Sequence, residues 1–110
     1  MEVLSKEYPQ LVEMFIVNAT KRYYINVDVA FDGDEYKYNQ VEIPAGKFDY
    51  SGVVDSLVQY KYPIDKMQAV INNYLLDPND VFAVEEFNAM QAWRKEAKEI
   101  AKEALLYELH

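Results

Sequence analysis

The sequence predicts an α+β fold, in which an antiparallel three-stranded meander packs against three helices, the C-terminal one long. Residues 23–31 alternate between apolar and polar side chains, as a half-buried antiparallel strand does. Apolar residues recur at helical spacing over 67–75 and again over 82–104. Because no linker, repeat or low-complexity segment interrupts the 110 residues, we expect one domain spanning 1–110, with a sheet region at 1–48 and a helical region at 50–110.

Three segments of the first half have the composition of strands. Residues 11–17 are apolar and end in β-branched side chains, although a short helix also fits their spacing. Residues 18–21 would form the turn that follows. The next strand, residues 23–31, is expected to end in a tight turn at Asp32-Gly33. Its partner strand would follow over 36–43 and end at Pro44-Ala45-Gly46. The predicted apolar face of residues 23–31 consists of Tyr23, Ile25, Val27, Val29 and Phe31. Residues 1–9 show no clear pattern.

Two shorter helices are predicted in the second half. Ser51 can cap the first, which would continue to about Tyr60. Pro63 suits the first turn of the second, where its missing N–H costs nothing. The apolar side of that helix follows the i, i+3, i+4 pattern at Met67, Val70, Ile71, Tyr74 and Leu75.

The long helix is predicted over Val81–Leu109, with Asn79 or Asp80 as its cap. One side carries the apolar residues Phe82, Ala83, Phe87, Met90, Trp93, Ala97, Ile100, Ala101 and Ala104. Such a helix is about 44 Å long, whereas a compact domain of this size has a radius of gyration near ~13 Å. We therefore expect an overhanging apolar end, made of Leu105, Leu106, Tyr107 and Leu109. This end either folds back on its own domain or forms an interface with a second copy or another protein.

Composition narrows the classes of partner and compartment. The net charge of −8 disfavours binding to nucleic acid through phosphates and docking on anionic membranes. The absence of cysteine excludes disulfides and thiolate chemistry. The first residues lack the pattern of a signal peptide, and the longest apolar runs, such as 14–17, are too short to span a bilayer. We expect a cytoplasmic protein.

No group of residues predicts catalysis, a metal site or a cofactor. The acidic turn at 32–35 lacks the ligand spacing of a calcium loop. The single histidine, His110, is the last residue, and three glycines form no phosphate-binding loop. Glu86 lies near the apolar side of the long helix, where we expect it to pair with Arg94. We therefore do not expect this protein to be an enzyme.

Ten tyrosines are the unusual feature of the composition. Tyr24, Tyr36 and Tyr38 would lie near one another on the predicted hairpin, where they form either a ligand surface or cross-strand aromatic pairs.

The second half also contains segments that resemble small uncharacterised proteins encoded by bacteriophages and prophages. These segments are 69–76 (AVINNYLL), 86–94 (EFNAMQAWR) and 97–101 (AKEIA), and the resemblance covers residues 50–105. It implies an assembly-accessory or virion-associated role, without catalytic residues.

From these observations we expect a non-enzymatic protein-interaction or assembly-accessory module. It would associate with itself, as a homodimer through the 105–109 end, or bind another protein. The alternatives are a small-ligand or glycan binder that uses the hairpin tyrosines, and an acidic mimic of nucleic acid.

Overall fold

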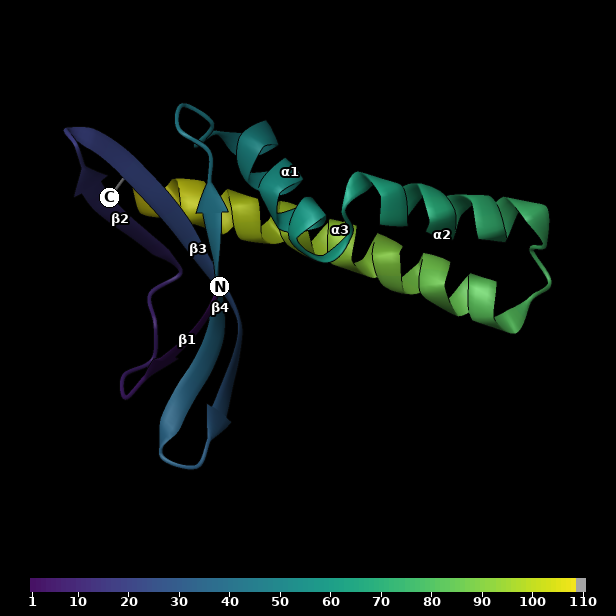
Figure 1. The fold of residues 1–110 in the computed structure, drawn as a ribbon, viewed down its shortest axis with the longest axis horizontal. Coiled ribbons are helices and arrows are strands. Elements are labelled where there is room, and N and C mark those ends of the chain that lie inside the picture. The colour runs from purple at the N-terminus through teal and green to yellow at the C-terminus, as the bar shows by residue number, and fades with distance from the viewer. Residues whose placement is uncertain (109–110) are drawn as a thin grey trace.

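The computed structural model describes the backbone of residues 1–108 and the side chains of residues 1–106. Four strands precede three helices along the chain (Figure 1). The elements are β1 (Glu2–Ser5), β2 (Val12–Val17), β3 (Thr20–Asp32), β4 (Glu35–Ile43), α1 (Tyr50–Lys61), α2 (Ile64–Leu76) and α3 (Val81–Glu108). The α+β class and the long C-terminal helix are therefore confirmed.

The sheet is antiparallel but has four strands, in the order β1-β4-β3-β2, so the predicted number of three was wrong. The additional strand is β1, which pairs along β4 from Glu2 opposite Asn39 to Ser5 opposite Tyr36. Four residues are too few to show an alternating pattern of their own. What makes them a strand is the unpaired edge of β4, which lies more than 30 residues away in the sequence.

Residues 12–17 form a strand rather than the alternative helix. A two-residue turn, Asn18-Ala19, connects β2 to β3, and both residues have positive φ, of 51° and 62°. Two successive left-handed residues match the twist of a tight hairpin. Strand pairing therefore resumes at Thr20, inside the segment predicted as turn.

A bulge at Asp28 changes the predicted faces of β3. The register with β4 shifts between Val27 and Ala30, and Asp28 adopts a φ of 56°. One extra residue in a strand moves the later side chains to the opposite face. Phe31 consequently pairs with Tyr36 on the open face of the sheet, so its predicted place beside Ile25 was wrong.

The helix caps differ in detail from the prediction. Asp49, not Ser51, caps α1, because its Oδ1 accepts a hydrogen bond of 2.7 Å from the Gly52 amide. Pro63 stands at the cap position before α2 rather than in its first turn. Asp80 caps α3, as predicted, by accepting from the amides of Phe82 and Ala83.

The main core lies between one face of the sheet, α1 and the C-terminal half of α3. Its buried members are Ile25, Val27, Val41, Ile43, Val53, Leu57, Val58, Trp93, Ala97, Ala101 and Ala104. The three alanines of α3 are fully buried, since side chains this small allow the helix to lie close to its neighbours.

The part of α3 that projects beyond the sheet beside α2 is its N-terminal half (Figure 1). This half packs beside α2, with the rings of Tyr74 and Phe87 stacked at 4.2 Å, and the pair extends away from the sheet. The predicted overhang of the C-terminal end includes residues whose side chains lie outside the described part of the chain, so it stays a prediction. The molecule measures 49 × 37 × 23 Å. The sequence pattern marks the buried side of α3 correctly except at Phe82, which is 77% exposed. It does not say where along the helix the sheet is placed.

Candidate protein-interaction surface

In the described backbone, residues 1–108, the sheet ends at β2, whose outer edge has no neighbouring strand. β2 pairs only with β3, from Val12 opposite Ile25 to Val17 opposite Thr20. The tight Asn18-Ala19 turn fixes this register. β2 is thus an edge strand of six residues.

The direction of each backbone group of β2 follows from one hydrogen bond. The Asn26 amide donates to the Leu11 carbonyl at 2.9 Å, so the backbone N–H and C=O groups of Leu11 point towards β3. Successive residues of an antiparallel strand alternate in this respect. The outward N–H and C=O groups therefore belong to Val12, Met14 and Ile16. No backbone group of residues 1–108 and no side chain of residues 1–106 hydrogen-bonds to them.

The side chains of β2 are unusually apolar for an exposed edge. Met14, Phe15, Ile16 and Val17 have between 44% and 68% of their surface exposed. Because neighbouring residues point to opposite faces, both faces of this edge are apolar. Edge strands normally carry lysine, proline or a bulge that prevents pairing with another chain. None of these features occurs in β2.

Glu13 is the only charged residue of β2, and polar groups of the sheet hold its side chain on the open face. Its Oε1 accepts from Asn26 Nδ2 at 2.9 Å, and its Oε2 accepts from Gln40 Nε2 at 3.1 Å. On β3, beside this edge, Lys21 and Arg22 supply positive charge, and Arg22 pairs with Glu42 at 2.9 Å. The edge therefore lacks the strong negative charge that the composition gives to the chain as a whole.

The C-terminal end of α3, predicted as an interface, lies close to the start of β2. Glu103 of α3 and Leu11 line the same hollow, and Figure 1 places the end of the helix beside β2. Leu105 is half-buried and Leu106 is 57% exposed. The side chains of Tyr107 and Leu109 lie outside the described residues. An interface role for this end stays a prediction.

The tyrosines Tyr24, Tyr36 and Tyr38 share the open face of the sheet, because Tyr24 lies opposite Glu42 and the residues of β4 alternate. Tyr24 packs against Phe15, whereas Tyr36 contacts Tyr8 and Phe31 at the other end of the face. Tyr38 lies between them and is only 5% exposed. The ligand surface stays a prediction, and the structure shows the aromatic pairs proposed as its alternative at Tyr24 and Tyr36.

Two tyrosines should make the protein less stable at alkaline pH. Burial, and then the charge of Glu13, raise the pKa of Tyr38. Burial, and then Asp28, raise the pKa of Tyr60. Tyrosines of the unfolded chain ionise near pH ~10, before these two do in the fold, so stability should fall as the pH rises above this value.

Tyr38→Phe removes one of these groups, so we expect a shallower loss of stability between about pH 10 and pH 12. Urea unfolding of both proteins across this range measures the difference. Equal slopes would contradict the raised pKa of Tyr38.

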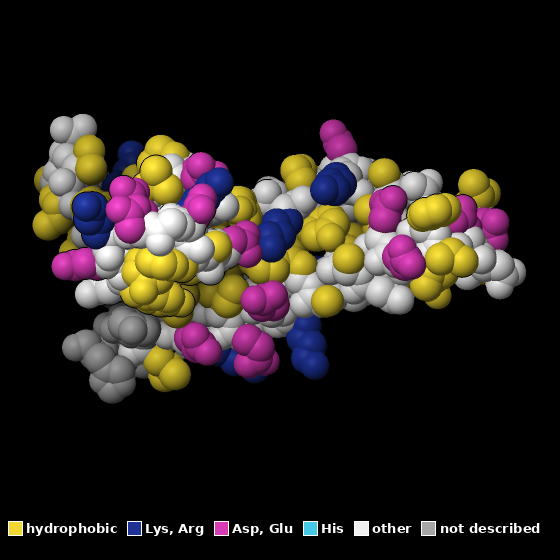
Figure 2. All heavy atoms as spheres, turned by 90° about the horizontal axis from the view of Figure 1, so that it is seen from below, with side chains coloured by type: hydrophobic (Ala, Val, Ile, Leu, Met, Phe, Trp, Pro, Cys, Tyr) yellow, Lys and Arg dark blue, Asp and Glu magenta, His cyan; other side chains and the backbone are white. Residues whose placement is uncertain are grey.

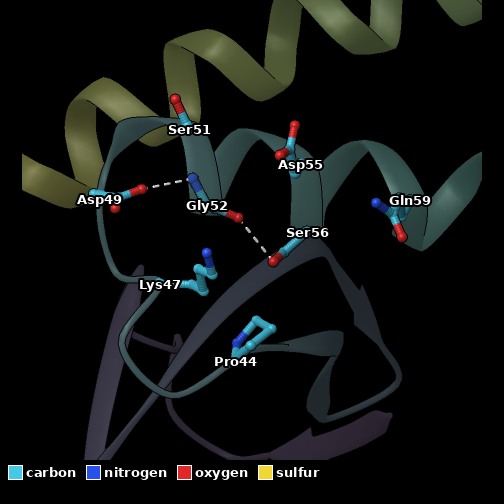
Figure 3. Close-up of a pocket in the computed structure, with 8 residues that line it drawn as sticks. All are labelled: Pro44, Lys47, Asp49, Ser51, Gly52, Asp55, Ser56 and Gln59. Carbon is cyan, nitrogen blue, oxygen red and sulfur yellow. Dashed lines mark hydrogen bonds between the residues drawn. The ribbon is translucent and has the colours of Figure 1, made fainter.

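A hollow of about 300 Å³ lies between the β4–α1 connection and α1 (Figure 3). Its lining residues are Pro44, Lys47, Asp49, Ser51, Gly52, Asp55, Ser56 and Gln59. Two of its polar side chains hold the helix, since Asp49 accepts from the Gly52 amide and Ser56 Oγ donates to the Gly52 carbonyl. These two side chains therefore stabilise the first turns of α1.

The predicted pair between Glu86 and Arg94 does not form among the described side chains. Glu86 is exposed, and the guanidinium of Arg94 instead donates to Gln91 at 3.4 Å. His110 lies outside the described residues.

A second apolar surface lies at the free end of the α2–α3 pair, where Figure 2 shows apolar side chains with acidic side chains between them. Its members Leu75, Leu76, Val81 and Phe82 are between 64% and 86% exposed. They flank the connection at 77–80. Unlike β2, this surface offers no row of unpaired backbone groups.

β2 was not among the interaction surfaces predicted from the sequence, although its apolar residues carried the signal. The run Met14–Val17 is four consecutive apolar residues, which leaves no polar face for water if the segment is a strand at the edge of the sheet. The position at the edge is known only from the strand order.

Among residues 1–108, no helix combines the length and apolar character that crossing a membrane requires. Among the side chains of residues 1–106, no three histidine or acidic groups gather as metal ligands would. In comparisons with protein-family models, with curated proteins and with solved structures, nothing matches this chain.

Proposed function

We propose that this chain is a protein-interaction module that associates with itself through the edge strand β2. The observation that carries the proposal is the apolar outer edge of β2, where Met14, Phe15, Ile16 and Val17 are exposed beside unpaired backbone groups. A strand of this kind gains hydrogen bonds and buries apolar surface on both faces when another strand pairs with it.

The proposed role is binding rather than catalysis. The polar side chains that are best positioned hold the fold together, as Glu13 does in the sheet and Asp49 does at α1. A self-associating module of this kind would suit the assembly-accessory role in a phage that the sequence resemblance implies.

The test is light scattering coupled to size exclusion across a range of protein concentrations. We expect wild type to have the mass of a dimer. Ile16→Lys should raise the dissociation constant at least about tenfold, since it places a charge at an apolar junction. Leu76→Lys is the matched control, because Leu76 is 86% exposed at the other end of the molecule. It should leave the mass unchanged.

Ile16 is itself 68% exposed, so its replacement should change the free energy of unfolding by less than about 0.5 kcal/mol. Urea unfolding checks that both variants are folded. A wild-type protein that stays monomeric at every concentration would show the proposal to be wrong, as would an Ile16→Lys protein that remains as dimeric as wild type.

A further inference from the structure

We infer that two copies of the chain join by antiparallel pairing of β2 with β2 of the second copy, about a two-fold axis at Phe15. Two four-stranded sheets would then form one sheet of eight strands. The inference rests on the proposed self-association and adds its geometry, which can fail separately.

The backbone groups of β2 are complementary to themselves. Outward N–H and C=O groups belong to Val12, Met14 and Ile16, as the bond from Asn26 to Leu11 establishes. A two-fold axis perpendicular to the sheet places the open faces of both copies on one side of the joined sheet and their core faces on the other. Residues that lie opposite each other must therefore belong to the same face. Pairing Met14 with Ile16 of the second copy satisfies this condition and joins outward groups in both chains. Symmetry repeats the pair, which gives four hydrogen bonds.

The side chains select this register from its neighbours. With Phe15 on the axis, Phe15 lies opposite its own equivalent, in the type of pair that brings side chains closest. A shift that centres Met14 would join Met14 with its equivalent and Val12 with Ile16, but it would separate the two Phe15 side chains and place a Glu13 carboxylate opposite each of them. In the inferred register Glu13 lies opposite Val17 instead, at the end of the paired segment. A shift that centres Ile16 would place Met14 opposite Asn18, whose φ of 51° ends the strand.

Electrostatics permit a second copy to approach at this edge although each chain carries a net charge of −8. In the inferred register Glu13 lies opposite Val17 of the second copy, so no two carboxylates of β2 oppose each other. The nearest charges on β3 are Lys21 and Arg22, opposite Ile16 and Phe15. Carboxylates are therefore few where the two chains meet.

The test uses disulfides, which are unambiguous here because the chain contains no cysteine. In Phe15→Cys, the two Cα atoms of the inferred pair would be about 4.5 Å apart, within the range of about 4.4–6.8 Å that a disulfide spans. Val17→Cys is the matched control on the same face of the same strand. Its equivalents would be about 14 Å apart, four residues along the strand.

Under mild oxidation we expect Phe15→Cys to form a covalent dimer and Val17→Cys to remain largely uncoupled, as measured by mass under non-reducing conditions. A mixture provides a second test in case Phe15→Cys weakens association. Met14→Cys and Ile16→Cys should each couple poorly alone but couple with each other, because only the mixed pair lies opposite in this register.

The outcomes separate this geometry from the proposed function. One outcome is a wild-type dimer that Ile16→Lys dissociates, while neither Phe15→Cys nor the mixture of Met14→Cys and Ile16→Cys forms a disulfide. That result would overturn the inferred pairing and leave self-association intact. Coupling of Val17→Cys or of Leu106→Cys instead would also overturn it, in favour of another register or of contact between helix ends. A monomeric wild type would overturn both.

Discussion

Gly52→Ala is expected to destabilise the protein by about 3 kcal/mol, although alanine normally stabilises a helix relative to glycine by up to about 1 kcal/mol. Gly52 lies in the first turn of α1, directly against the backbone of Lys47 (Figure 3). A Cβ atom there would overlap the Lys47 carbonyl oxygen and lie 2.8 Å from its carbonyl carbon.

The overlap cannot be relieved cheaply because backbone atoms form the obstacle. The Lys47 carbonyl accepts from the Asp49 amide at 2.8 Å, and the Lys47 amide donates to Pro44 at 3.0 Å. Moving α1 away would also break the cap that Asp49 makes with the Gly52 amide.

Urea unfolding of wild type, Gly52→Ala and two controls measures the effect. Ser51→Ala, at an exposed neighbour in the same helix, should change stability by less than about 0.5 kcal/mol. Gly33→Ala, at a φ of +72° with no atom within 4 Å, should cost only the conformational term of about 1 kcal/mol. A stabilised Gly52→Ala protein would show that the close approach is wrong.

The elements that sequence patterns predicted well are those whose signal is local. The alternation of β3 and the helical spacing of α2 and α3 depend on residues a few positions apart, and so does the cap at Asp80. β1 was missed because its only stabilising partner is β4, far along the chain. The bulge at Asp28 was missed because the Tyr60 hydroxyl and the Lys61 ammonium that bind its carboxylate come from α1.

The candidate surface shows the same division. Sequence established that residues 14–17 are apolar, but their exposure follows from the strand order, which places β2 at an edge. The projection of the N-terminal half of α3 beyond the sheet was not predicted, because periodicity fixes the buried side of a helix and not its position along the axis. Tyr38 was grouped with Tyr24 and Tyr36 on the correct hairpin, yet it alone is almost fully buried.

Trp93→Ala should destabilise the protein by about 4 kcal/mol, in the upper range for removal of a buried aromatic side chain. The indole is 5% exposed and joins α3 to α1, where its N–H donates to the Leu57 carbonyl at 2.8 Å. The ammonium of Lys61 lies 4.0 Å from the ring centre while also pairing with Asp28 at the bulge. Loss of the ring therefore removes packing, a hydrogen bond and the support of the ion pair that connects α1 to the sheet.

Trp93→Phe separates these contributions in part, since it keeps much of the apolar volume and removes the N–H together with the rest of the indole that a phenyl ring does not fill. We expect it to cost about 1–2 kcal/mol, clearly less than Trp93→Ala. Urea unfolding followed by circular dichroism measures both, because neither variant retains the tryptophan fluorescence. If Trp93→Ala cost less than about 1 kcal/mol, α1 and the sheet would have to be held to α3 by the alanine contacts at 97, 101 and 104 alone. In that case the contacts among Trp93, Lys61 and Asp28 would not determine how the helices pack on the sheet.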